Sequence, residues 1–420
     1  MLYDYIIIGG GITGITMARL LQQSGVRHIL VLEAEPEAGG LCRTRRIGDH
    51  VLDIGGGHFL CSKFPEVYRF IFAHLPQNEF VDCERVSKID LGGHEIDYPL
   101  ESNIWQLPAE ICADYLISIV QNGEARGLPP PADFDGWIRW KLGNQVAERY
   151  MFPYNRKIWG VEPHEMDIDW LYKIPRLDVR EIVMSCLTKQ SDRSKMPSHS
   201  RFYYPRRGGF QRVFDALYNP VRDLVRLGEP VNLLEHTKDG LLVNGRLHAR
   251  HVINTAPWHT LRESALFAPE DRSAIDQLRH NSLVVSLHEE NYRTPTHWVY
   301  LPALDQPHHR SFYIHNFAPD SSPNGVYRET NANRWHGEAD CLHHHINSHA
   351  YPIPTIGWAK AIARVLATAE QTGVYGLGRW GQWQYFNSDV CILEAMRLAD
   401  RLGHTAWRST LIPAMTKAPA

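Results

Sequence analysis

The sequence predicts an α/β fold that begins with a strand, a tight glycine turn and a helix. Residues 6–8 are an apolar run of isoleucines, which suits a buried parallel strand. The spacing G-x-G-x-x-G follows directly, and residues 15–24 have the pattern of a helix. A second apolar run at residues 29–32 ends in Glu33, about 20 residues beyond the glycines. Together these observations predict a strand–helix–strand unit at the start of the chain.

Each part of this unit suits a bound dinucleotide. Gly9 allows the tight turn, Gly11 lets the backbone approach a pyrophosphate, and Gly14 lets the helix pack close to the strand. The helix N-terminus supplies unpaired N–H groups and the positive end of the helix dipole. Glu33 can accept hydrogen bonds from ribose hydroxyls. We therefore predict dinucleotide binding, and the alternative is a structural turn of the same shape without a ligand.

The composition excludes several other classes of protein. A formal net charge of −3 on 420 residues gives no electrostatic case for nucleic acid as a partner. No apolar run approaches the roughly 18 residues that a membrane span needs. The chain opens straight into its first strand, so we expect no signal peptide. The seven cysteines are scattered and form no C-x-x-C pair, which favours reduced thiols in a cytoplasmic protein.

The segment that follows Glu33 resembles the second glycine signature of a large flavoprotein superfamily. It reads Ala-Gly-Gly-Leu-Cys-Arg-Thr over residues 38–44. The superfamily includes the amine oxidases, protoporphyrinogen oxidase and UDP-galactopyranose mutase. The resemblance implies FAD, with the glycine pair and Arg43 near its phosphates and ribityl chain. A nicotinamide dehydrogenase is not expected to carry this segment.

A run of three glycines, residues 55–57, follows a short strand and precedes His58. Such a run lets the backbone pass close to something planar or bulky. His58 matches the His of a Gly-Pro-His stretch in the mutases, which implies contact with the flavin ring. Cys61 stands where the family has a second His, so a role that needs two histidines is in doubt. The alternative is a plain glycine turn with a capping His.

The C-terminal part resembles the mutases in the order of its motifs. Tyr-Pro-Ile, a helix, a strand and Gly-Arg-x-Gly follow one another, and Gly378, Arg379, Tyr385 and Asp389 match. Trp383 replaces a Tyr of the family. The resemblance implies that Arg379 lies by the ribityl chain or the ring, and that a helix N-terminus faces the flavin C2 carbonyl. The alternative is an ordinary C-terminal strand and helix.

The middle of the chain carries candidates for substrate binding. Residues 154–160 resemble a mutase segment, so Trp159 could wall a substrate pocket or could be a core residue. Arg176 and Arg180 follow a proline, as does an Arg that holds the substrate diphosphate in the mutases. A guanidinium fork fits phosphate oxygens, although single arginines are usually surface charges. Val231, in an expected strand at 229–235, matches a residue whose backbone contacts adenine in the superfamily.

The histidines near residues 308–349 raise the question of a metal site. His345 and His349 have helical spacing, but there is no H-E-x-x-H, and no cysteine or carboxylate set completes a site. A solvated histidine-rich loop is favoured, and we predict no metal.

The fold class that follows is α/β, with a Rossmann-like FAD-binding domain built from separated segments and an inserted α+β substrate domain. The expected FAD-binding domain comprises residues 1–80, 203–260 and 370–420. The expected substrate-binding domain comprises residues 81–202 and 261–369.

The expected site residues fall into three groups. The catalytic candidates are His58 and Arg379. The substrate-binding candidates are Tyr154, Trp159, Arg176, Arg180, Trp383 and Tyr385. The cofactor-binding candidates are Gly9, Gly11, Ile12, Thr13, Gly14, Glu33, Ala34, Gly39, Gly40, Leu41, Cys42, Arg43, Gly56, Gly57, His58, Val231, Gly378, Arg379, Asp389 and Val390.

The resemblance implies a flavoenzyme of the UDP-galactopyranose mutase type. In that family, N5 of the reduced flavin attacks the anomeric carbon of a nucleotide-linked sugar, and the sugar ring opens and recloses at a different size. The alternative is an oxidoreductase of the amine oxidase or protoporphyrinogen oxidase type, which transfers hydride from substrate to FAD. A flavin-binding protein without catalysis is the third possibility. The expected partner is a small-molecule substrate, with a homo-oligomer also possible.

Overall fold

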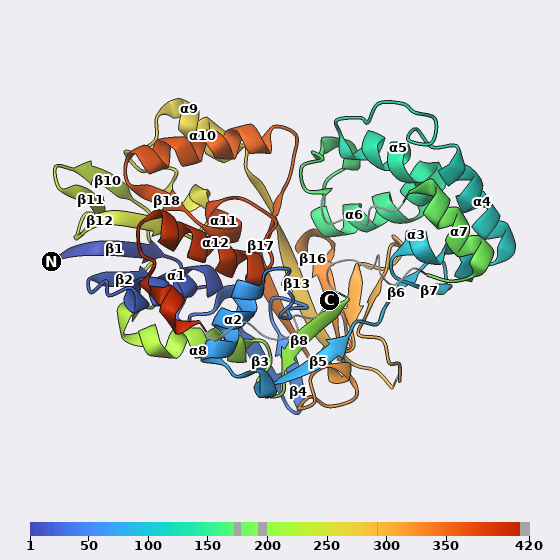
Figure 1. The fold of residues 1–420 in the computed structure, drawn as a ribbon, viewed down its shortest axis with the longest axis horizontal. Coiled ribbons are helices and arrows are strands. Elements are labelled where there is room, and N and C mark those ends of the chain that lie inside the picture. Colours follow the sequence, from blue (N-terminus) through green and yellow to red (C-terminus); the bar gives the residue numbers. More distant parts are fainter. Residues whose placement is uncertain (172–177, 192–199, 292, 412–420) are drawn as a thin grey trace.

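The computed structural model of the protein describes residues 1–171, 178–191, 200–291 and 293–411. Two large β-sheets form its frame (Figure 1). The first lies around the N-terminus, the second runs through the middle of the molecule, and a group of helices lies at the far end of the second sheet.

The first sheet has the strand order β10-β11-β12-β1-β2-β9, and β18 pairs with β12 as well. Its strands are β1 (Leu2–Ile8), β2 (Ile29–Leu32), β9 (Val225–Arg226), β10 (Leu234–Thr237), β11 (Gly240–Val243), β12 (Leu247–Asn254) and β18 (Val374–Gly376). β1 lies in the middle and pairs in parallel with both β12 and β2. The central strand is thus completed by segments that are far apart in the sequence.

Helices cover both faces of β1, which explains its unbroken apolar run. Ile7 packs in one core with α1 (Ile12–Gln23), α2 (Pro65–His74), α8 (Gln211–Tyr218) and α12 (Ser388–Arg401). Ile6 and Ile8 pack in another core with α9 (Pro269–Asp276) and α10 (Trp358–Gln371). Successive side chains of a strand point to opposite faces, so a strand between two helical layers is apolar at every position.

The second sheet has the order β17-β13-β16-β15-β14-β6-β7. Its strands are β6 (Ser87–Asp90), β7 (Glu95–Asp97), β13 (Arg279–Glu289), β14 (Trp298–Tyr300), β15 (Arg310–Phe312), β16 (Gly325–Asn331) and β17 (His343–Ile353). All neighbours are antiparallel except β6 and β14. Two separate pairs are β3 (Thr44–Ile47) with β4 (His50–Asp53), and β5 (Phe80–Glu84) with β8 (Arg201–Pro205). The short helix α11 (Gly378–Gly381) follows β18.

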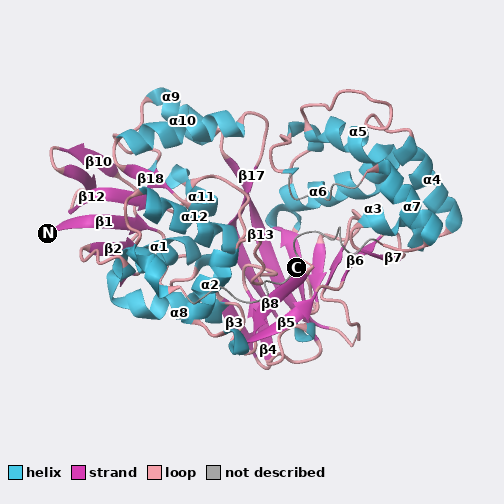
Figure 2. Cartoon of the chain, viewed as in Figure 1, coloured by secondary structure: helices cyan, strands magenta, loops and turns pink. Residues whose placement is uncertain are grey.

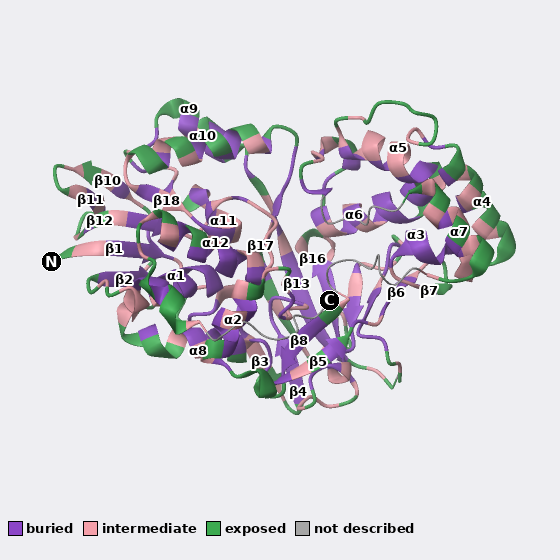
Figure 3. Cartoon of the chain, in the orientation of Figure 1, coloured by how far each residue is buried: buried purple, intermediate pink, exposed green. Residues whose placement is uncertain are grey.

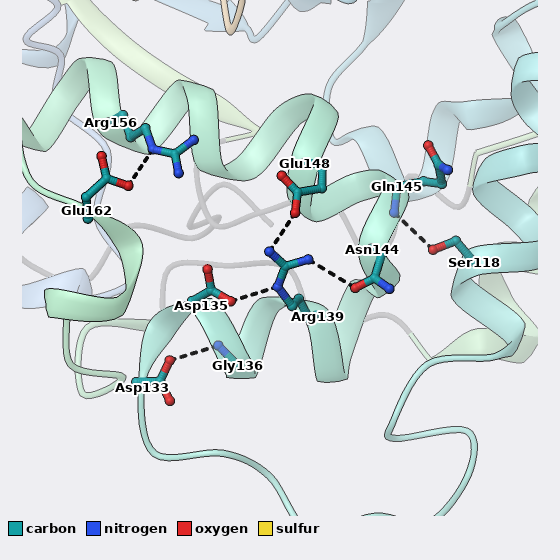
Figure 4. Close-up of polar contacts among 10 residues, drawn as sticks. All are labelled: Ser118, Asp133, Asp135, Gly136, Arg139, Asn144, Gln145, Glu148, Arg156 and Glu162. Carbon is teal, nitrogen blue, oxygen red and sulfur yellow. Dashed lines mark hydrogen bonds and ion pairs between the residues drawn. The ribbon is translucent and has the colours of Figure 1, made fainter.

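The helical group comprises α3 (Leu100–Asn103), α4 (Ala109–Val120), α5 (Phe134–Val146), α6 (Phe152–Trp159) and α7 (Val179–Thr188). α5 is kinked at Gly143, whose φ of 80° lies in the left-handed region. Arg139 spans the kink by donating to Asp135 at 2.7 Å, Asn144 at 3.2 Å and Glu148 at 2.6 Å (Figure 4).

Two further contacts in Figure 4 fix the neighbours of this kink. The N–H of Gln145 donates to the Ser118 hydroxyl on α4 at 3.0 Å, and Arg156 on α6 pairs with Glu162 at 2.8 Å. The first bond joins α5 to α4, and the second joins α6 to the turn that follows it. α6 is the helix that carries the candidates Tyr154 and Trp159.

Figure 2 shows helices on both sides of the first sheet and at the end of the second. In Figure 3 the long strands β13 and β16 are mostly buried, whereas exposed residues gather on outer helices such as α4 and α9. Across the described ranges, every helix is too short or too polar to cross a bilayer. All seven cysteines lie in the described ranges and are free thiols.

The predicted α/β class is confirmed, and most predicted elements are present. Two local predictions are wrong. The expected strand at 229–235 belongs to no helix or strand as far as Leu233, and β10 begins only at Leu234. The histidine-rich stretch expected to be a solvated loop contains β17 instead, because pairing with β13 satisfies its backbone along almost its whole length.

Candidate active site

A cavity of ≈ 360 Å³ lies at the carboxyl ends of β1 and β2. Open α/β sheets bind ligands at this edge, where strand ends and helix N-termini meet. The end of β1 contributes Ile8 and Gly9, and the start of α1 contributes Gly11, Ile12 and Thr13. Leu32, Glu33 and Ala34 line it from β2.

The three glycines of the first turn have different surroundings. Gly9 has a φ of 101°, and a Cβ there would lie 2.4 Å from the Thr255 hydroxyl. A Cβ on Gly14 would lie 2.0 Å from the Gly9 carbonyl, so the helix could not approach the strand with any other residue. A Cβ on Gly11 would meet no atom of the described chain within 4 Å, which leaves this part of the cavity wall open.

The N-terminus of α1 faces this open wall. Among the described residues no side chain caps the helix, and Gly11 is its N-cap. The first N–H groups of a helix need acceptors, and phosphate oxygens are suitable ones. This arrangement fits the diphosphate of FAD.

Glu33 is fixed at one end of the cavity. One carboxylate oxygen accepts from the Gly10 N–H at 2.6 Å, and the other accepts from the Glu35 N–H at 2.9 Å. The segment expected to contact adenine also lines the cavity, through Pro230, Val231 and Asn232. A fixed carboxylate beside an apolar wall fits a ribose and an adenine.

Arg43 lies beside the glycine pair and is only 6% exposed. Its Nε donates to the Gly40 carbonyl at 3.0 Å, and its Nη1 lies 2.6 Å from Glu35. Gly39 has a φ of 121°, and a Cβ there would lie 2.7 Å from the Arg43 side chain. The glycine therefore lets a buried guanidinium group reach the cavity.

His58 and Arg379 line the same cavity. His58 Nδ1 lies 3.2 Å from the Gly56 carbonyl, which can only accept, so Nδ1 carries the proton and Nε2 is an acceptor. Burial, together with the charge of Arg379, lowers the pKa of His58 to about 4, so the ring is neutral near pH 7. Arg379 donates to the carbonyls of Phe386 at 2.8 Å and Ala350 at 3.0 Å, which fixes its direction.

Behind His58 lies an ion pair between cross-strand neighbours, Arg310 on β15 and Glu329 on β16. Arg310 Nε and Nη2 lie 2.8 and 2.5 Å from one Glu329 oxygen, and the other oxygen accepts from the Gly57 N–H at 3.0 Å. Burial alone would raise the pKa of Glu329, but Arg310 and His309 lower it to about 2. Glu329 is thus a buried carboxylate that keeps its charge.

Four partly buried tyrosines surround the two arginines, and we call Tyr154, Tyr300, Tyr351 and Tyr385 the tyrosine cluster. Tyr154 and Tyr300 have ring centroids 5.5 Å apart, and Tyr351 and Tyr385 are 5.0 Å apart. The Arg379 guanidinium lies 5.3 Å from the centre of the Tyr351 ring, which joins the cluster to the cavity. The charge of Arg310 acts on Tyr154, Tyr300 and Tyr351.

The structure brings most predicted cofactor residues together, but not all of them. The predicted residues that line the cavity are Gly9, Gly11, Ile12, Thr13, Glu33, Ala34, Gly39, Gly40, Leu41, Cys42, Arg43, His58, Val231 and Arg379. Gly14, Gly56, Gly57, Gly378, Asp389 and Val390 are not part of its lining. Three of these glycines serve close packing, because a Cβ would lie 2.0 Å from Glu329 at Gly56, 2.1 Å from Phe312 at Gly57 and 2.5 Å from Thr13 at Gly378.

The predicted substrate residues divide in the same way. Tyr154 and Tyr385 belong to the tyrosine cluster, whereas Trp159 is a buried residue that packs against Tyr351 and Tyr385 and donates to Asn155. Trp383 is buried against Trp380 and His259 and is core. Arg180 is exposed on α7, away from the cavity lining, and Arg176 lies outside the described residues.

Sequence reasoning missed one whole wall of the cavity. Residues 345–349 of β17 line it, with His345, Asn347 and His349 among them. Thr255, Ala256 and Pro257, which follow β12, form another part. The spacing of His345 and His349 did not predict that both line the cavity, because their positions depend on the pairing between β17 and β13.

Comparisons with known proteins agree with this geometry. Residues 7–73 match the family model for an NAD(P)-binding Rossmann-like domain, and residues 142–327 match the model for flavin-containing amine oxidoreductases. A probable UDP-galactopyranose mutase from Klebsiella pneumoniae is 21% identical, with 98% of each chain covered. The flavin-containing amine oxidase A of Bos taurus is 42% identical over 66% of this chain and 54% of its own length. A crystal structure of reduced UDP-galactopyranose mutase has a TM-score of 0.86 at 20% identity, covering 98% of this chain and 96% of the other.

These findings define the class of protein. The chain is an FAD-dependent enzyme, and it is similar in sequence and fold to the amine oxidases and the UDP-galactopyranose mutases. Among the relatives named above, the mutases share nearly the full length of the chain, whereas the amine oxidase shares part of it.

Proposed function

We propose that this flavoenzyme interconverts the pyranose and furanose rings of a nucleotide-linked sugar, with FAD in its reduced form. The observation that carries the proposal is the position of Arg379, which lines the cofactor cavity beside His58 and also lies over Tyr351 of the tyrosine cluster. A substrate held by the cluster would have its phosphates next to this guanidinium group and its sugar next to the cofactor.

The charges around the cluster suit an anionic substrate. Arg310 and Glu329 neutralise one another, so Arg379 leaves one net positive charge among these three groups. Arg379 is held by two carbonyl oxygens, which do not cancel its charge. A fixed guanidinium group is a good partner for phosphate oxygens.

Each group has a definite task in this proposal. Reduced FAD supplies the nucleophilic ring chemistry when it is bound. His58 accepts a hydrogen bond from a sugar hydroxyl through its neutral Nε2, because its Nδ1 proton is engaged by Gly56. The tyrosines pack against the sugar and the base, and exclude water from the reacting carbon.

The direct test uses the protein reduced by dithionite without oxygen. A panel of UDP- and TDP-hexoses is added, and the pyranose and furanose forms are separated by chromatography. We expect ring isomers from one or more members with the reduced enzyme and none with the oxidised enzyme. Absence of isomers from the whole panel would contradict the proposal.

An oxidoreductase of the amine oxidase type is the second candidate. It is favoured by the match of residues 142–327 to the amine oxidoreductase model, because that range includes Tyr154, Tyr300 and Arg310. The partly buried rings of the tyrosine cluster would suit a cationic amine, which ring faces attract. Anaerobic bleaching of oxidised FAD by an amine, with no effect of nucleotide sugars, would support this function instead.

Three further expectations stay predictions. We propose a cytoplasmic location from the seven scattered cysteines, and an assembly into homo-oligomers is possible on the sequence alone. We also propose the division into a FAD-binding domain and a substrate-binding domain at the boundaries given above. Limited proteolysis with and without FAD would test those boundaries.

A further inference from the structure

A second polar cluster lies on the second sheet, formed by one histidine and two acids that the proposed reaction does not use. His288 on β13 has a fully buried side chain. Glu338 and Asp340 come from the segment before β17. One ligand atom from each of the three lies within 4.8 Å of those of the other two.

The two ring nitrogens of His288 have different partners. Nε2 lies 2.9 Å from the Ser286 hydroxyl and 3.3 Å from Glu338. Nδ1 lies 3.4 Å from Asp340, and it has no hydrogen bond among the described residues. The Ser286 hydroxyl can donate to Nε2 or accept from it, so this contact allows either tautomer; when the proton is on Nε2, the lone pair of Nδ1 faces a carboxylate oxygen.

Glu338 has a second buried oxygen without a hydrogen bond within the described chain. An imidazole beside two acids, with unpaired buried atoms on His288 and on Glu338, has the donor set of a metal ion.

We propose that His288, Glu338 and Asp340 bind a zinc ion through His288 Nδ1 and one oxygen of each acid. Tetrahedral zinc with bonds of about 2.0–2.1 Å places neighbouring ligand atoms about 3.4 Å apart. The separation of Nδ1 from the Asp340 oxygen is 3.4 Å. The Ser286 hydroxyl then holds the other ring nitrogen, as second partners of zinc-bound histidines do.

The charges of the neighbours are consistent with a divalent cation. Arg328 lies 2.7 Å from Glu290 and 2.5 Å from Glu338. If Glu290 balances Arg328, then Glu338 and Asp340 leave two negative charges, which a zinc ion neutralises. The Cys341 thiol lies near enough for the charges of Glu338 and Asp340 to act on it.

The zinc ion would attach the segment before β17 to β13. A single backbone bond, from the Leu342 N–H to the Leu287 carbonyl at 2.9 Å, already joins the two at this point. β17 carries the wall of residues 345–349, so the ion would fix the start of the strand that completes the cofactor cavity. This inference does not depend on which reaction the enzyme catalyses.

The test uses the untagged holoenzyme, cleared of metal with a chelator and then titrated with Zn²⁺ by calorimetry, with bound zinc counted by mass spectrometry. Asp340→Asn is the main variant, because Asp340 is 67% exposed and its loss does not threaten folding. His94→Gln is the matched control, since it removes an exposed imidazole from the turn between β6 and β7. FAD absorbance and circular dichroism verify that every variant is folded.

We expect one tight zinc ion in the wild type and in His94→Gln. Asp340→Asn should bind it at least about 10-fold more weakly, because even partners outside the ligand set change zinc affinity by about 10–100-fold. Ser286→Ala, which keeps all three ligands, should weaken binding by a similar factor. Wild-type stoichiometry and affinity in Asp340→Asn, or no tight zinc in the wild type, would overturn the proposal.

Discussion

At the scale of single residues, the site depends on groups whose charge state is fixed by what surrounds them. His58 is held neutral, Glu329 is held ionised, and Arg379 is held by two carbonyl oxygens. None of these states follows from the residue type alone. Each one depends on neighbours that come from distant parts of the chain.

Replacement of Arg379 should separate catalysis from cofactor binding. In Arg379→Ala we expect turnover to fall by about 100-fold or more, as for the loss of one fixed donor to a developing charge. FAD should be partly retained, because the N-terminal glycine turn, Glu33 and Arg43 stay in place. Rates of sugar isomerisation and the FAD absorbance per chain measure the two effects. Arg180→Ala, which removes an exposed arginine, should keep full activity; full activity in Arg379→Ala would remove Arg379 from the site.

His58 should make the stability of the protein depend on pH in a defined range. Its pKa is about 4 in the folded chain and 6.5 when unperturbed, so between these values the unfolded chain binds more protons. The stabilising contribution is therefore complete above pH 6.5 and is lost as the pH falls towards 4. Urea unfolding at several pH values should give a shallower slope in His58→Gln than in the wild type. Equal slopes would show that His58 titrates normally in the folded state.

The rate of sugar isomerisation should also depend on His58. We expect His58→Ala to lower the rate at pH 7, since the variant has no acceptor for a sugar hydroxyl. Unchanged kinetics in this variant would make His58 a structural residue.

The ion pair of Arg310 and Glu329 should dominate the local stability. Glu329 is fully buried, and its removal leaves Arg310 without its partner. Breaking a buried pair from one side costs about 3–5 kcal/mol, so Glu329→Gln should lose about that much free energy of unfolding. Glu290→Gln is the control, because Glu290 is 31% exposed and its pair with Arg328 should contribute much less. Thermal unfolding of both variants measures the difference, and similar losses in the two would contradict the assignment.

At the scale of elements, helix α1 shows how one turn divides its tasks between glycines. Gly14 makes the contact between helix and strand, whereas Gly11 borders the open cavity. The same substitution should therefore affect FAD binding at Gly11 and the stability of the fold at Gly14.

Gly11→Ala should leave the fold intact and weaken the binding of FAD. Gly11 has a φ of −77°, which alanine adopts easily, and the added methyl group would meet no described protein atom within 4 Å. It would occupy space that the diphosphate needs, so we expect FAD affinity to fall by about 10-fold or more. Gly14→Ala places its methyl group 2.0 Å from the Gly9 carbonyl and should cost about 1–3 kcal/mol of stability. Apoenzyme melting and fluorescence titration with FAD distinguish the two, and a stable Gly14→Ala protein with normal FAD affinity would refute the assignment.

Strand β17 marks the limit of what sequence patterns can predict. The glycine turn, the helix after it and Glu33 could be predicted because they follow one another within one strand–helix–strand unit of about 30 residues and carry a specific spacing. The wall at 345–349 could not, because its side chains reach the cavity only through pairing of β17 with β13. Arg310 was missed for the same reason, since it faces Glu329 only in the register of β15 and β16.

At the scale of the whole molecule, the fold class and the cofactor could be predicted, but the substrate region only in part. Local motifs identify the first sheet, which has a common architecture. The tyrosine cluster combines α6, β14, β17 and the segment after α11, and these come together only in the folded chain. Trp159 and Trp383 illustrate the difficulty: both are buried, and a motif beside an aromatic residue does not distinguish a pocket wall from core, so their substrate roles stay predictions.

The cavity has a consequence for how the protein acquires its cofactor in a cell. Its lining extends from Ile8 to Cys391, so the walls cannot close until the chain as far as Cys391 has left the ribosome. During translation the nascent chain exposes the glycine turn long before β17 and α12 exist. FAD capture is therefore expected to follow the synthesis of β17 and α12.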